Sequence, residues 1–245
     1  MRTKPQWPRF VGVRPAASTL CALLLTAFTI HSTVANMPQG DQTKLVILGA
    51  SYAASWGAPP LPGYGVLNRG VGGETTKAMH ARFQRDVVGE KASVVLIWGH
   101  INNITQADIV GASAGRIEAV KVAARADYLA MLQQARAANV EVILATEIPM
   151  AEPAGLVNEA RALVGHLLGK RSYADQVNTQ VRDLNTFLRQ LASREKLRLL
   201  DFEKILAPDG GARKPDYATE DHSHVTTAGY QALTRYAAAE LAKPR

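Results

Sequence analysis

Five short apolar runs, in which apolar residues do not alternate with polar ones, constrain the fold of this chain most strongly. Such runs are typical of strands that are buried on both faces of a sheet. Between the runs, apolar residues recur at spacings of three and four, which predicts helices with one buried face. Strands that alternate with helices predict an α/β fold, in which helices cover both sides of a five-stranded parallel sheet. The predicted strands are Leu45–Leu48, Val66-Leu67, Ser93–Trp98, Val140–Ala145 and Leu197–Leu200.

Four stretches of the sequence carry the helical pattern. The stretch from Thr75 to Val87 is the weakest, while Ile117–Ala135 and Val177–Leu191 each form a clear apolar stripe. The last helix is expected to begin at Thr226-Thr227, whose side chains can cap it, and to run to Leu241. No repeat, low-complexity segment or linker divides the sequence, so residues 36–245 are expected to form a single domain.

The first 35 residues have the pattern of a secretory signal peptide. Four basic residues and no acidic ones occur there, and the uncharged apolar run Ala16–Ile30 precedes a small-residue cleavage site that ends at Ala35. We therefore expect a periplasmic or secreted protein with no stable membrane insertion after cleavage. The alternative is an uncleaved N-terminal anchor, although the run is short for a membrane span of about 20 residues.

Charge and cysteine content exclude several classes of function once this leader is removed. The whole chain has a net charge of +7, but residues 36–245 contain 24 basic and 21 acidic residues, which leaves only +3. This small excess removes the main support for a nucleic-acid partner. The single cysteine, Cys21, lies within the leader, so the mature chain has no disulfide, thiol nucleophile or thiolate metal site.

Polar and glycine clusters follow the predicted strands at the edge of the sheet where open α/β folds bind ligands. Ser51 follows the first strand, Gly70–Gly73 the second and Asn102-Asn103 the third, while Asp221–His224 precedes the last helix. We expect these four clusters to converge on one rim.

Two of the clusters can supply a nucleophile and its base. A serine such as Ser51 attacks an acyl group only when a base takes its proton, and a lone serine at this kind of junction is more often a helix cap. Asp221 precedes His224 by three residues and can accept the proton of Nδ1, which fixes the tautomer of the imidazole. The alternatives are a metal pair formed by His222 and His224, or a capping aspartate in a polar loop.

The other two clusters can stabilise an oxyanion. The side-chain amide of Asn102 and the backbone N–H groups of Gly73 and Ser51 could donate to it. Taken alone, the Asn-Asn pair is typical of a turn and the glycines of a backbone with positive φ.

The four clusters together resemble the sequence blocks of the SGNH hydrolase family, the GDSL-type esterases and lipases. The resemblance extends over about residues 44–241, and its blocks are Val46–Ser51, Asn68–Thr76, Trp98–Asn103 and Asp221–Tyr230. It implies a three-layer α/β/α, flavodoxin-like SGNH hydrolase fold. It also implies Ser51 as nucleophile, His224 as base and Asp221 as its orienting partner. The oxyanion hole would consist of Ser51, Gly73 and Asn102, with no metal or organic cofactor.

The sequence departs from the family pattern at three places. Ala50 replaces the usual aspartate before the serine, Asn103 stands where an aspartate is commoner, and the third block has an additional residue between Gly99 and its asparagine. Either asparagine could then face the oxyanion. Asn102 is preferred, because Asn103 then takes the place of the family's aspartate.

These features together predict a secreted serine hydrolase that cleaves carboxylic or O-acetyl esters through an acyl-enzyme on Ser51. The substrate would be a small-molecule, glycan or lipid ester. A cell-surface glycan acyltransferase with the same site, or an inactive binding protein on the same fold, are the alternatives. The segment Ala151–Lys170 could line an acyl groove or cover the sheet as a helix. Glu147 and Arg213-Lys214 could contact a polar substrate or be solvated rim charges.

Overall fold

The computed structural model describes residues 42–153, 170–208 and 210–244. All of them belong to one compact unit, Gln39–Arg245. The expected signal peptide, residues 1–35, and most of the segment 151–170 lie outside the described residues. None of the described helices is both long and apolar enough to cross a membrane.

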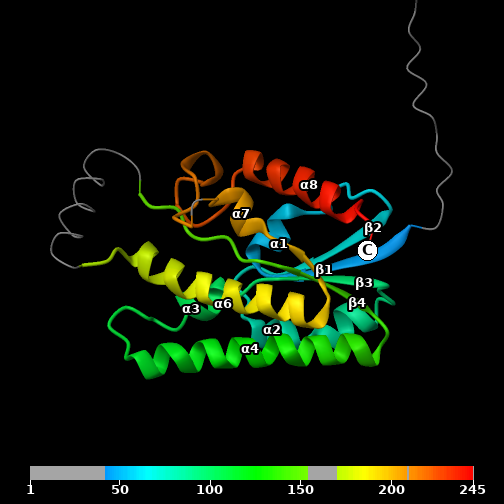
Figure 1. Ribbon diagram of the computed structural model, residues 1–245, viewed down its shortest axis with the longest axis horizontal. Helices are drawn as coiled ribbons and strands as arrows, with labels where there is room; N and C mark the ends of the chain where they lie inside the picture. The colour runs from blue at the N-terminus through cyan, green and yellow to red at the C-terminus, as the bar shows by residue number, and fades with distance from the viewer. Residues whose placement is uncertain (1–41, 154–169, 209, 245) are drawn as a thin grey trace, which may run out of the picture. The chain divides into compact units, whose positions relative to one another are not determined.

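A five-stranded parallel sheet forms the centre of the fold, as the apolar runs predict (Figure 1). Its strands lie in the order β2-β1-β3-β4-β5, which is the flavodoxin-like order. The predicted α/β fold is therefore confirmed. The strands are β1 (Thr43–Gly49), β2 (Tyr64–Gly70), β3 (Val94–Trp98), β4 (Glu141–Ala145) and β5 (Arg198–Leu200).

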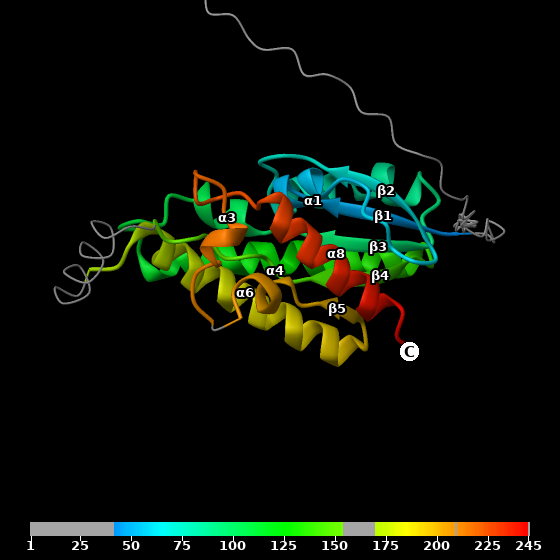
Figure 2. The same ribbon diagram turned by 90° about the horizontal axis from the view of Figure 1, so that it is seen from above.

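Helices cover both faces of the sheet and form the outer two of three layers (Figures 1 and 2). Along β1, Leu45 and Ile47 pack into one core while Val46 and Leu48 pack into the other, and all four side chains are fully buried. Burial on both faces explains why the strands read as continuous apolar runs. The helices are α1 (Ser51–Trp56), α2 (Thr76–Ala81), α3 (Ile101–Thr105), α4 (Ala114–Ala137), α6 (Tyr173–Glu195), α7 (Phe202–Leu206) and α8 (Thr227–Leu241).

Two sequence predictions about helices have different outcomes. Thr226 caps α8 as expected, because its hydroxyl accepts a hydrogen bond of 3.2 Å from the backbone of Gly229. The expected helix from Thr75 to Val87 is interrupted, since α2 ends at Ala81 and a separate π-helical turn occupies Gln84–Val88. The interruption coincides with Arg82, whose side chain turns inward towards the end of β1.

The register of the sheet brings the carboxyl ends of the first three strands level with one another. Gly49, the last residue of β1, pairs with Gly70 of β2 on one side and with Trp98 of β3 on the other. The segments that follow these three strands therefore start from the same rim.

Candidate active site

Ser51 is the first residue of α1, directly beyond the end of β1. Ala50 occupies the N-cap position, and no side chain caps this helix, so the interpretation of Ser51 as a helix cap is wrong. Backbone N–H groups in the first turn of a helix have no acceptor within the helix. The N–H of Ser51 is therefore placed to donate to a group outside the helix, and the helix dipole favours a negative charge there.

Two glycines shape the loop that follows β2. A Cβ atom on Gly70 would lie 2.2 Å from the backbone nitrogen of Ala54, so glycine is what allows α1 to pack directly on this strand. Gly73 has a φ of +78°, which glycine adopts without steric cost. A Cβ on Gly73 would meet no described atom within 4 Å, so the loop is open on this side.

The two asparagines at the start of α3 have different partners. Asn103 is held at both ends of its amide by Thr76, because its oxygen accepts from the backbone nitrogen at 3.0 Å and its nitrogen donates to the hydroxyl at 2.8 Å. Asn102 donates one amide hydrogen to the carbonyl of Glu74 at 2.9 Å, next to Gly73. A side-chain amide carries two hydrogens, so Asn102 keeps a second donor beside the glycine loop.

A tight loop before α8 joins Asp221 to His224. One carboxylate oxygen of Asp221 lies 2.5 Å from Nδ1 of His224. The other accepts from the backbone N–H groups of Ser223 and His224 and from the hydroxyl of Thr219, at 2.7–2.9 Å. Burial alone would raise the pKa of Asp221, but these hydrogen bonds, led by the one from the His224 side chain, hold that pKa well below its usual range. The carboxylate therefore stays charged next to the imidazole.

Tyr52, the neighbour of Ser51, connects α1 to this loop. Its hydroxyl donates to the carbonyl of Ser223 at 2.6 Å, although the two residues are 171 positions apart. The rings of Tyr52 and His224 meet edge to face, with their centroids 6.4 Å apart. The expected convergence of the first and last sequence blocks on one rim therefore occurs.

Within the described part of the chain, no direct hydrogen bond joins Ser51 to His224. Hydrogen bonds between a nucleophile and its base are often long in enzymes without bound substrate and shorten when the substrate binds. The described residues also contain no group of three or more His, Cys, Asp or Glu side chains that could hold a metal ion, so the His222 and His224 pair lacks a third ligand there.

Comparison with known proteins identifies the family. The model of the GDSL-like Lipase/Acylhydrolase family matches residues 33–232. The chain belongs to this family. The resemblance to SGNH hydrolases is thereby confirmed, and the chain is a member of a family of ester hydrolases.

Several solved structures share the fold of this chain. A GDSL-like lipase from Bacteroides thetaiotaomicron is 19% identical, with a TM-score of 0.57 over 80% of this chain and 85% of that one. A lipase/acylhydrolase from Enterococcus faecalis is also 19% identical, with a TM-score of 0.53 over 81% and 94%. A catalytic mutant of an acetylxylan esterase from Geobacillus stearothermophilus is 16% identical, with a TM-score of 0.55 over 85% and 98%. No curated protein matches the sequence significantly.

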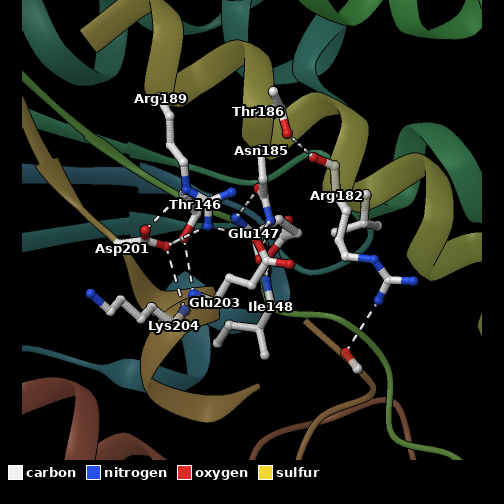
Figure 3. A network of polar contacts seen from close by, with 12 residues as sticks. Thr146, Glu147, Ile148, Arg182, Asn185, Thr186, Arg189, Asp201, Glu203 and Lys204 are labelled. Carbon is white, nitrogen blue, oxygen red and sulfur yellow. Dashed lines mark hydrogen bonds and ion pairs between the residues drawn. The ribbon is translucent and has the colours of Figure 1, made fainter. Parts of the chain in front are cut away.

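The structure assigns Glu147 a role that neither sequence interpretation anticipated. Glu147 is only 1% exposed, so it is neither a solvated rim charge nor a contact for substrate. Its carboxylate accepts from the backbone N–H groups of His100 and Ile101, at 2.7 and 3.1 Å, and so holds the start of α3. Its backbone is held in turn by Asn185, which also donates to Glu203 (Figure 3).

Arg213 is likewise buried, at 2% exposure, although Lys214 beside it is exposed. Its guanidinium donates to backbone carbonyls of the Asp221–His224 loop.

Arg82 is a third buried charge, and the sequence analysis did not single it out. Its side chain donates to the carbonyl of Gly49 and to the carboxylate of Glu74, and so connects the end of β1 to the glycine loop. Nothing in the local sequence around these three charges signals their burial.

Proposed function

We propose that this GDSL-like acylhydrolase is a serine ester hydrolase that cleaves carboxylic or O-acetyl esters through an acyl-enzyme on Ser51. The observation that carries the proposal is the close Asp221–His224 pair, on a loop that touches Tyr52 next to Ser51. A serine at a helix start, an imidazole with a charged orienting partner and nearby amide donors are the parts that acyl transfer requires.

In the first half of the reaction, the hydroxyl of Ser51 attacks the acyl carbon and Nε2 of His224 takes its proton. Asp221 keeps the imidazole oriented and stabilises the imidazolium. The negative charge that develops on the carbonyl oxygen is held by the N–H groups of Ser51 and Gly73 and by the side chain of Asn102. The C–O bond to the alcohol then breaks, and His224 returns the proton to the departing oxygen.

In the second half, water replaces the alcohol. His224 takes a proton from water as the oxygen attacks the acyl-enzyme, and the same donors hold the new oxyanion. The bond to Ser51 breaks, and its oxygen recovers the proton from His224. In the net reaction, one ester and one water are consumed, and one acid and one alcohol are released.

O-acetylated carbohydrate is the substrate class that the structural relatives support, since one of them is an acetylxylan esterase. The open loop at Gly73 and the half-exposed His224 are compatible with a bulky alcohol portion of the substrate.

We also propose that residues 1–35 export the chain as a signal peptide to the periplasm or the medium, and that residues 36–245 form the single hydrolase domain.

The decisive experiment is Ser51→Ala, with Ser55→Ala as its matched control. Ser55 lies one turn further along α1 and is exposed, so its loss should leave turnover unchanged. Ser51→Ala should lower kcat on a short p-nitrophenyl ester by about 10⁴-fold or more, at an unchanged melting temperature. A fluorophosphonate probe should label wild type on the peptide that contains Ser51. Unchanged turnover in the purified variant would reject the proposal.

A series of acyl esters and acetylated xylooligosaccharides then defines the substrate. We expect kcat/KM to be highest for acetyl esters and acetate to be released from the acetylated sugars. A preference for long acyl chains would indicate a lipid substrate instead. Product analysis with and without an acceptor sugar distinguishes hydrolysis from acyl transfer.

A further inference from the structure

We propose that Arg213 is a positioning residue that fixes the His224 loop against the helix carrying Ser51. This inference rests on the proposed serine hydrolase function. Arg213 touches neither the nucleophile nor the reacting atoms. It acts through the backbone of the loop that carries His224.

Four hydrogen bonds from one guanidinium carry the inference. Nη1 donates to the carbonyl of His224 at 2.5 Å, and Nη2 donates to the carbonyl of Ser223 at 2.8 Å. Nη2 also donates to the hydroxyl of Tyr52 at 2.6 Å, and Nε donates to the carbonyl of Pro149 at 3.0 Å. One rigid group therefore joins the loop of the base, the helix of the nucleophile and the segment after β4.

Tyr52 connects the His224 loop to α1, the helix that carries Ser51. Its hydroxyl accepts from Arg213 and donates to the same Ser223 carbonyl, so three groups form a small triangle. Burial is the largest influence on this phenol and raises its pKa above the usual range, which keeps the hydroxyl protonated and able to donate. The guanidinium also lies 5.2 Å from the centre of the Tyr52 ring. Since Tyr52 follows Ser51 directly, a shift of this triangle moves both residues.

The charge of Arg213 makes the arrangement stiff. Among the residues that the structure describes, the hydrogen bonds of Arg213 go to three backbone carbonyl oxygens and one hydroxyl oxygen, and none goes to a carboxylate. A buried charge is costly unless it is fully hydrogen-bonded. Any displacement of the His224 loop would leave a charged N–H without its acceptor, so the loop is held at one distance.

The planar fork of an arginine is required for this geometry. A guanidinium presents five N–H donors in fixed directions, and its four acceptors here lie on three segments of the chain: the His224 loop, α1 and the segment after β4. A lysine carries the same charge but only three donors on one atom. Arg213→Lys should therefore restore part of the function that a neutral side chain loses, without reaching the wild-type rate.

The test compares Arg213→Met, Arg213→Lys and Tyr52→Phe with Arg198→Met as a matched control. Arg198 also donates to two backbone carbonyls, those of Leu241 and Lys243, but at the opposite end of the sheet from the site. For each full-length variant, kcat and KM on a short p-nitrophenyl ester, the rate of fluorophosphonate labelling and the melting temperature are measured.

We expect Arg213→Met to lower kcat and the labelling rate by about 100-fold, since a shift of about 1 Å between reacting groups costs that much, while KM changes by less than about threefold. Arg213→Lys should fall between this variant and wild type. Tyr52→Phe should lower kcat as well, and the double variant with Arg213→Met should lose less than the product of the single losses, because both act through one contact. Arg198→Met should keep the wild-type kcat.

The inference is overturned if folded Arg213→Lys and Tyr52→Phe keep the wild-type kcat and labelling rate and lose only thermal stability. These two variants decide the matter even if Arg213→Met does not fold. A wild-type protein without esterase activity, or an active Ser51→Ala variant, would reject the proposed function instead.

Discussion

Asp221 holds His224 at two points, by its ring and by its backbone. One carboxylate oxygen lies 2.5 Å from Nδ1 of the imidazole, and the other lies 2.9 Å from the backbone nitrogen of the same residue. An ionised carboxylate can only accept hydrogen bonds, so Nδ1 carries a proton, and in the neutral imidazole the free lone pair is then on Nε2. The backbone contact fixes the loop and the ring contact fixes the tautomer. A general base needs both.

Replacing Asp221 by Asn should separate these two contacts. The amide oxygen can still accept from the loop backbone, but the amide nitrogen facing Nδ1 favours the opposite tautomer of His224. We expect kcat to fall by about 10³–10⁴-fold while KM and the melting temperature change little. Steady-state kinetics and thermal denaturation measure the two effects. A variant with wild-type kcat would show that the pair has no part in turnover.

Replacing Asn102 by Ala should remove one donor from the oxyanion hole. The variant keeps the contacts of Asn103 with Thr76, so the start of α3 should remain in place. Loss of one such donor typically lowers kcat by about 10²–10³-fold, and the melting temperature should change little. The kcat of the purified variant on a short ester measures this.

Asn103→Ala is the matched control for that substitution. It removes both hydrogen bonds to Thr76, a residue whose side chain is fully buried, so it should cost about 1–3 kcal/mol of unfolding free energy. Its effect on kcat should be smaller than that of Asn102→Ala. The reverse order of effects would assign the oxyanion contact to Asn103.

Glu147→Gln should weaken the attachment of α3, the helix that carries Asn102. The carboxylate accepts from His100, Ile101 and its own neighbour Ile148, and a Gln amide nitrogen would face one of these donors. We expect the unfolding free energy to fall by about 1–3 kcal/mol and kcat to fall about tenfold. Urea denaturation and steady-state kinetics give the two values.

Glu118→Gln provides the comparison for Glu147. This glutamate is half exposed on α4 and pairs with Lys121 and Arg125 at the surface, where an ion pair is worth about 0–1 kcal/mol. Equal losses of stability in the two variants would contradict the role inferred for the buried carboxylate.

Stability at acid pH should depend on Asp86. A hydrogen bond from Arg85 is the largest influence on this carboxyl, and with a further bond from Arg82 it outweighs burial and lowers the pKa to about 2. The unfolded chain therefore takes up this proton at higher pH than the folded chain does. The resulting stability is complete above the ordinary carboxyl pKa of about 4, and it is lost as the pH falls to about 2.

Urea denaturation of wild type and Asp86→Asn between pH 2 and pH 7 tests this dependence. The variant should be the less stable protein at pH 7, and the difference in unfolding free energy should shrink as the pH falls. A difference that stays constant over this range would mean that the charge of Asp86 makes no contribution.

Local sequence patterns predicted the strands and the long helices, because the pattern of each element depends on which of its own faces are buried. The strands β1, β3 and β4 are largely buried on both faces, so they are apolar over most of their length, while the half-buried edge strands β2 and β5 contain shorter apolar stretches. Each of the five runs begins within two residues of the start of an observed strand. The long helices α4 and α6 carry stripes that extend over several turns. The helices α1, α3 and α7 have only five or six residues each, which is too short for a period of 3.6 to emerge.

The sequence by itself determined that Ser51, Gly73 and Asn102 stand at the rim of the sheet, because each lies within four residues of the end of a strand and parallel strands all end on the same side. Asp221 and His224 follow no strand directly, and contacts with α1 bring their loop to the same rim. Only the tertiary structure decided what holds them there. Arg213 meets Tyr52 across 161 positions, and Glu147 reaches back 47 positions to His100. In the sequence both look like ordinary charged residues, since their burial depends on acceptors and donors that distant segments supply. Asn102 and Asn103 differ for the same reason, because contacts with another loop, and not their identity, set the direction of each amide.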